Sequence, residues 1–157
     1  MQAPTDLSSL GLPPADQVGF VVRDLEASMK LYGPMFGPWS LMDGSVDASE
    51  YRGRLSDVKL NIAFGQSGPL QIELIEWVEG DSPHAEFIRA GREGMHHLRF
   101  RVEDADGWID KVKTIGYQVV WYKKWCADTT FVYLERPGDP LWIEFLQMPP
   151  GGPGTGG

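Results

Sequence analysis

The chain has 157 residues, 42% hydrophobic and 23% charged, which is typical of a globular protein with one sizeable core. Fourteen basic against 22 acidic residues give a net charge of −8, which argues against nucleic acid as a partner. No apolar run approaches the roughly 20 residues of a membrane span, and no signal-peptide pattern opens the chain. The single cysteine, Cys126, excludes an internal disulfide, so we expect a cytoplasmic protein without a membrane partner.

The sequence pattern of the first half predicts several short strands and two helices. Residues 1–15 are mostly polar and proline-containing, so we expect a flexible arm there. Asp24 is a suitable N-cap for a helix that closes at Gly33 and Pro34. The expected elements are a strand at Gln17–Val22, the helix at Leu25–Tyr32, strands at Trp39–Met42, Lys59–Phe64 and Leu70–Trp77, a mobile loop at Asp43–Ser56, and a short helix at His84–Ala90.

After Gly94 the same order of elements begins again. The expected elements are a strand at His97–Val102, a helix capped by Asp104 that runs through Thr114, a strand at Tyr117–Trp121, and a hairpin of Thr129–Glu135 with Leu141–Leu146. Residues 149–157 consist almost entirely of glycine and proline, so we predict a disordered tail.

The two halves align as an internal repeat. Gln17–Asp24 overlays His97–Asp104 without a gap, and Gln71–Ile75 overlays Trp142–Leu146. Strand, helix, strand, strand, strand therefore occurs twice, which predicts two βαβββ modules over residues 16–92 and 93–148.

The repeat also pairs polar residues that are competent metal ligands. Gln17 matches His97, and Glu73 matches Glu144. Each glutamate has large apolar neighbours on both sides, so each side chain points away from the apolar face of its strand. A pseudo-twofold axis would bring all four toward one place, where they could bind a divalent metal. The alternative is that both glutamates occupy ordinary solvent-facing positions on strands.

These residues resemble the vicinal oxygen chelate (glyoxalase, bleomycin resistance, dioxygenase) superfamily over about residues 16–148. The resemblance implies an α+β fold of two βαβββ modules that form a curled mixed sheet around a metal site. It also implies Gln17, Glu73, His97 and Glu144 as the metal ligands. The segments that carry it are Asp16-Gln17-Val18-Gly19-Phe20, Gln71-Ile72-Glu73-Leu74, His96-His97-Leu98-Arg99-Phe100 and Trp142-Ile143-Glu144-Phe145-Leu146.

Two branches of this superfamily compete. The ligand set and Leu141–Leu146 resemble glyoxalase I, yet the positions aligned with its glutathione-binding side chains hold Val21, Trp77 and Glu93. The segment from Asp81 to His97 resembles methylmalonyl-CoA epimerase instead, although that family usually has histidine at the position of Gln17. Because the chain combines features of glyoxalase I and methylmalonyl-CoA epimerase, the resemblance implies a relative of both families that has a substrate of its own.

The resemblance implies a metal-dependent isomerase, epimerase or lyase that removes a proton next to a carbonyl. Its intermediate would be an enolate or enediolate on the metal, and the substrate a small acyl or hydroxycarbonyl compound. Glu144 is the expected base and Glu73 its partner on the opposite face. Zn, Ni, Co, Mn and Fe all suit such mixed N/O ligands. Members of the superfamily are commonly homodimers, in some of which two subunits share the metal site.

A metal-free protein of the bleomycin-resistance type, which sequesters a ligand between aromatic rings, is the alternative function. Six tryptophans and the mixed aromatic and basic stretch at residues 121–125 keep it open. In either case we expect Arg99, Arg101, Trp121 and Lys124 to bind the ligand. His96 is expected to be structural, and His84 to lie on the surface or at a helix start.

Overall fold

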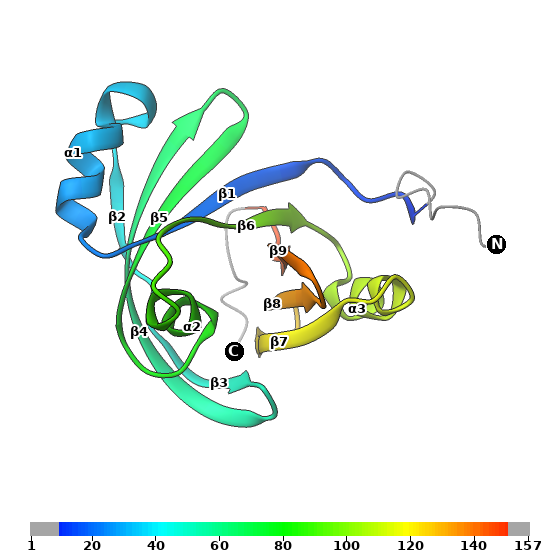
Figure 1. The fold of residues 1–157 in the computed structure, drawn as a ribbon. Helices are drawn as coiled ribbons and strands as arrows, with labels where there is room; N and C mark the ends of the chain where they lie inside the picture. Colours follow the sequence, from blue (N-terminus) through cyan, green and yellow to red (C-terminus); the bar gives the residue numbers. More distant parts are fainter. Residues whose placement is uncertain (1–9, 151–157) are drawn as a thin grey trace.

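The computed structural model describes residues 10–150, and the strands of this part form one nine-stranded sheet that closes on itself. The strand order is β2-β4-β3-β7-β8-β9-β6-β1-β5, and β5 pairs in turn with β4. The long, curved β4 and β5 lie on one side and β7–β9 on the other (Figure 1). The elements are β1 (Ala15–Val22), α1 (Leu25–Phe36), β2 (Ser40–Asp43), β3 (Val46–Tyr51), β4 (Arg54–Ser67), β5 (Leu70–Glu79), α2 (Pro83–Arg89), β6 (Gly94–Arg101), α3 (Ala105–Lys113), β7 (Gln118–Cys126), β8 (Thr129–Arg136) and β9 (Asp139–Gln147).

This architecture confirms the expected α+β fold with a curled mixed sheet. In each half the first strand runs parallel to the last, β1 beside β5 and β6 beside β9, while β1 and β6 join the halves antiparallel. The adjacent strands β9, β6, β1 and β5 are therefore the ones that carry Glu144, His97, Gln17 and Glu73.

The predicted helix starts are confirmed by their caps. The Asp24 carboxylate accepts a hydrogen bond from the Ala27 amide at 3.0 Å, and Asp104 accepts one from the Gly107 amide at 3.0 Å. Helix α1 lies on β4 and β5, and α3 lies on β8 and β9. Ile109 and Val112 of α3 are buried against Val132 and Phe145, so each helix covers one side of the curled sheet.

Two local predictions for the first half are wrong. Helix α1 continues through Pro34 to Phe36 instead of closing at Gly33. The segment expected to be a mobile loop contains β3, which pairs with both β4 and β7. An irregularity between Val46 and Ser49, where Ala48 has φ of 50°, breaks the two-residue alternation that marks a strand. The first half consequently has one strand more than the second.

The predicted ends lie partly outside the described residues. Of the arm expected over residues 1–15, residues 1–9 fall outside, and Ala15 already belongs to β1. Of the tail expected over residues 149–157, residues 151–157 fall outside. Within residues 10–150, no helix has the length and apolar character needed to cross a membrane.

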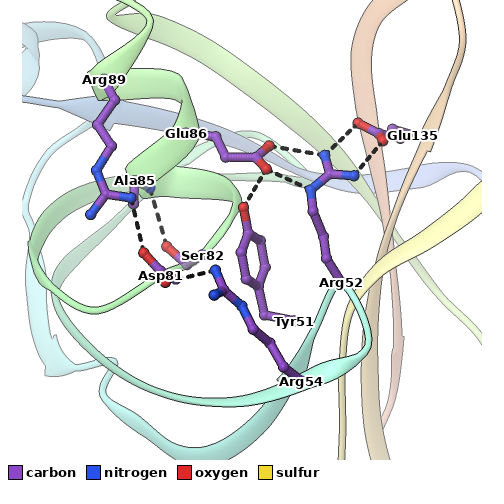
Figure 2. Close-up of polar contacts among 9 residues, drawn as sticks. All are labelled: Tyr51, Arg52, Arg54, Asp81, Ser82, Ala85, Glu86, Arg89 and Glu135. Carbon is purple, nitrogen blue, oxygen red and sulfur yellow. Dashed lines mark hydrogen bonds and ion pairs between the residues drawn. The ribbon is translucent and has the colours of Figure 1, made fainter.

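A network of ion pairs fastens the β3–β4 hairpin to α2 and β8 (Figure 2). Arg52, at the tip of this hairpin, donates to Glu86 of α2 at 2.5 Å and to Glu135 of β8 at 2.9 Å. The Tyr51 hydroxyl also donates to Glu86. We call this group the Arg52 clasp, because it ties segments of both halves of the chain together.

Candidate active site

Three side-chain oxygens converge on one nitrogen of His97. Its Nε2 lies 3.4 Å from Oε1 of Glu73, 3.3 Å from Oε1 of Glu144 and 3.4 Å from Oε1 of Gln17. All four side chains are buried, with at most 8% of each residue exposed. The structure thus brings together the four residues that the repeat paired, and it does so within one chain.

The sheet register explains this convergence. Gly19 of β1 lies opposite both Glu73 of β5 and His97 of β6, while Arg99 lies opposite Glu144 of β9. The His97 ring packs directly on the glycine, because a Cβ on Gly19 would lie 2.1 Å from Cε1 of His97. A side chain at position 19 would therefore push the imidazole out of the site.

The carboxylates control the charge of this cluster. Burial alone lowers the pKa of His97, but hydrogen bonds and charge from Glu144 and Glu73 outweigh burial and raise it to about 9. Burial raises the pKa of Glu144, and the nearby His97 and Arg99 only partly offset that effect. The Tyr133 hydroxyl lies 3.4 Å from Nε2 of His97. Burial and both carboxylate charges raise the pKa of Tyr133 well above its usual value, so the hydroxyl stays protonated.

The Gln17 amide has two possible orientations, which differ in the group presented to His97. In one, Oε1 faces His97 and the nitrogen donates to Gln71 at 2.7 Å. In the exchanged orientation the nitrogen donates to Glu73 at 3.2 Å and the oxygen accepts from Arg99 at 3.0 Å. The exchanged orientation satisfies the amide when no cation is bound, whereas the first presents an oxygen to a cation.

The donor set fits a divalent metal in chemistry, and the separations measured from His97 fit one in size. Ligands at about 2.0–2.2 Å from an ion, set about 90–110° apart, are separated by roughly 3.0–3.5 Å. The distances of 3.3–3.4 Å around His97 fall in that range. As the side chains stand, residues 10–150 contain no group of three or more His, Cys, Asp or Glu residues arranged to hold an ion. Small rotations of the carboxylates would therefore have to accompany metal binding.

A cavity of about 500 Å³ opens over this cluster. Glu73, Glu144 and Tyr133 reach it from the sheet, and aromatic and aliphatic side chains form most of its wall. A cavity of this size is in the range that encloses a small molecule.

Three of the four residues expected to bind the ligand line this cavity, namely Arg99, Arg101 and Trp121. Lys124 does not. It is exposed and its Nζ lies 3.9 Å from Asp106 of α3, so ligand binding by Lys124 stays a prediction. Lys124 is three residues from Trp121 in β7, so strand alternation places the two side chains on opposite faces.

The other two histidines lie behind the cluster. His96 is 1% exposed, stacks on Trp142, and its Nδ1 is 3.0 Å from Nδ1 of His97. His84 lies in the first turn of α2 but is fully buried against His96, so a surface position is wrong. Burial lowers the pKa of both rings, which keeps both neutral.

Sequence reasoning missed Gly19 and Tyr133. The overlay of β1 on β6 aligns Gly19 with Arg99. This pairing of the smallest residue with a long side chain is the signal in the sequence that could have identified Gly19. Tyr133 gave no signal of its own, since it reaches the cluster only because β8 neighbours β9.

Comparisons with known proteins agree with this geometry. Residues 16–133 match the family model described as the Glyoxalase/Bleomycin resistance protein/Dioxygenase superfamily. The uncharacterized protein YqjC of Bacillus subtilis (strain 168) is 29% identical over 85 residues, which are 54% of this chain and 54% of that protein. The match thus spans about half the length of that relative.

Solved structures share the fold at low identity. A hypothetical protein from Bacillus halodurans C-125 superposes with a TM-score of 0.61 and 23% identity, over 87% of this chain and 94% of that one. Methylmalonyl-CoA epimerase from Mycobacterium tuberculosis superposes with a TM-score of 0.59 and 20% identity, over 95% and 94% respectively. At these identities the likeness establishes the fold and leaves the reaction open.

Proposed function

The chain belongs to the glyoxalase/bleomycin resistance protein/dioxygenase superfamily, and on that premise we propose that it is a metal-dependent isomerase, epimerase or lyase. Its reaction would begin with removal of a proton next to a carbonyl group, as in methylmalonyl-CoA epimerase or glyoxalase I. The observation that carries the proposal is the convergence of Gln17, Glu73 and Glu144 on Nε2 of His97 beneath a cavity.

In this proposal Gln17, Glu73, His97 and Glu144 hold a divalent ion such as Zn, Ni, Co, Mn or Fe. The ion supplies positive charge for the oxyanion that develops as the substrate loses its proton. The Gln17 amide adopts the orientation that turns its oxygen toward His97. This leaves Arg99 free of Gln17 and available to the cavity.

Glu144 is the proposed base. It lines the cavity, and because it is also a proposed metal ligand, one of its carboxylate oxygens would have to leave the ion to accept the proton. Glu73 reaches the same cavity from β5, two strands away from β6, and would return the proton from the other side. Tyr133 keeps its own proton and can donate a hydrogen bond to a substrate oxygen.

Deuterium exchange tests this function. In D2O, the protein should exchange the proton next to the carbonyl of methylmalonyl-CoA or of phenylpyruvate, followed by NMR. Glu144→Gln should lower the exchange rate about 100-fold or more, because an amide cannot accept the proton. Glu103→Gln, at an exposed position, is the matched control and should exchange as the natural protein does. Unchanged exchange in Glu144→Gln would contradict the base assignment.

A ligand-sequestering protein of the bleomycin-resistance type remains the second candidate, because aromatic side chains surround the cavity. Metal analysis of the purified protein separates the two functions. About one equivalent of a divalent metal, lost when Glu73 and Glu144 are both changed to Gln, supports the enzyme. Tight binding of an aromatic compound to protein without metal supports sequestration. The expected homodimer stays a prediction that light scattering can check.

A further inference from the structure

The walls of the cavity select for an apolar molecule. Phe64, Trp121, Trp125 and Phe131 line it together with aliphatic side chains such as Leu146. Trp125 is 49% exposed, so one edge of this aromatic wall faces solvent. Rings in such a wall bind a flat or branched hydrocarbon group by contact area and stacking.

The charge of the cavity limits how many anionic groups it accepts. Arg99 and Arg101 are the basic residues among the described lining, against the carboxylates of Asp43, Glu73 and Glu144. Asp16, outside the lining, pairs with Arg99, so two positive and four negative charges leave −2, which a divalent ion on the proposed ligands would bring to 0. Without excess positive charge, the cavity is suited to no more than one anionic group.

Arg99 is the residue placed to hold that group. Asp16 grips it from one side, with Nε and Nη2 donating to the carboxylate at 3.0 Å each, which fixes the plane of the guanidinium. Its side chain is only 13% exposed, and it lines the cavity together with the proposed base Glu144. Arg101 lies further out and donates to the carbonyls of Met148 and Pro149.

From this arrangement we propose that the substrate is a compact carboxylic acid with one negative charge and an aromatic or branched apolar body. Its carboxylate pairs with Arg99, and its body lies against Trp121 and Phe131. The inference rests on the proposed function and narrows its substrate class. A CoA thioester is disfavoured, because it carries several phosphate charges and no lysine is among the described residues that line the cavity.

Calorimetric titration with 3-phenyllactate, lactate and methylmalonyl-CoA tests the proposal, using the purified protein before and after saturation with Zn²⁺. Phenyllactate should bind at least about tenfold more tightly than lactate, because its ring buries apolar surface. It should also bind more tightly than methylmalonyl-CoA. Equal affinity for phenyllactate and lactate, or preference for the CoA thioester, would overturn the proposed substrate class.

Variants locate the anionic subsite. Arg99→Gln should weaken phenyllactate binding roughly 10- to 100-fold, since a charge-assisted bidentate pair is lost. Lys113→Gln removes the same charge from the exposed end of α3 and should bind as the natural protein does. The phenyllactate affinity of Arg99→Lys should lie between those of Arg99→Gln and Lys113→Gln. If circular dichroism shows that Arg99→Gln does not fold, the affinities of the natural protein for phenyllactate, lactate and methylmalonyl-CoA still test the substrate class.

The two proposals can fail separately. Phenyllactate binding that depends on Arg99, without proton exchange in phenylpyruvate, upholds the substrate class and contradicts the isomerase function. Exchange in methylmalonyl-CoA without phenyllactate binding upholds the function and contradicts the substrate class.

Discussion

At the scale of single residues, the site depends on a glycine, Gly19, which has no side chain. Gly19 lies between Glu73 and His97 in the sheet, and the imidazole occupies the volume where a Cβ would be. Its counterpart in the second half is Arg99, which fills the equivalent place with a guanidinium. The same position of the repeat therefore holds Gly19 in the first half, which leaves space for the His97 ring, and Arg99 in the second half, which carries a positive charge.

Gly19→Ala should displace His97 and lower the free energy of unfolding by about 1–3 kcal/mol, the usual cost of forcing extra volume into a packed interior. Metal affinity, measured by calorimetry, should fall with it. Gly33→Ala is the matched control, because a Cβ there meets Trp39 at 3.5 Å within a helix. It should cost no more than about 1 kcal/mol, because the Cβ meets only the ring of the following Pro34 and the edge of Trp39. Equal effects of the two changes would show that Gly19 has no special role.

The raised pKa of His97 predicts how stability depends on pH in protein stripped of metal. The folded pKa of about 9 exceeds the ordinary value of 6.5, so the folded protein holds this proton more tightly than the unfolded chain does. The stabilisation is complete below about pH 6.5 and is lost as the pH rises through about 9. Urea unfolding should show a loss of at most about 3 kcal/mol from this group across that window. His97→Gln should remove this slope, and a slope that persists would contradict the assignment.

At the scale of elements, the Arg52 clasp connects parts that are distant in sequence. Arg52 has φ of 46°, a conformation that favours glycine or asparagine, and it is kept there by Glu86 and Glu135. A second group lies nearby, in which Asp81 accepts from both Arg54 and Arg89 (Figure 2). These ion pairs hold α2 against the hairpin, and α2 in turn buries His84 behind the site.

Arg52→Asn keeps a residue that tolerates this backbone conformation and removes the guanidinium. We expect a loss of about 1 kcal/mol in urea unfolding, a modest value because the Arg52 side chain is 40% exposed and its pairs are partly screened. Arg54→Asn is the comparison, since its side chain is 63% exposed and, among residues 10–150, Asp81 is the carboxylate that it pairs with. A larger loss in Arg54→Asn than in Arg52→Asn would contradict the clasp.

At the scale of the whole molecule, neither half closes the sheet without the other. The halves join through β1 with β6 and through β3 with β7, and the four proposed ligands come two from each half. The site therefore forms only when the β1–β6 junction is made.

Unfolding should accordingly be a single transition. Circular dichroism, which reports the sheet, and tryptophan fluorescence, which reports mainly the interior around Trp121, should give one urea midpoint. A free energy of about 5–15 kcal/mol is ordinary for a domain of this size. Two separated midpoints would mean that the halves fold independently.

The sequence by itself determined the repeat, the helix caps at Asp24 and Asp104, and the pairing of residues 17 with 97 and 73 with 144. These follow from local patterns, because a cap is a matter of three residues and strand alternation has a period of two. Only the tertiary structure decided that His97 rests on Gly19 and that Tyr133 joins the cluster. Those outcomes depend on which strands are neighbours, and the spacing of residues along one strand does not encode that.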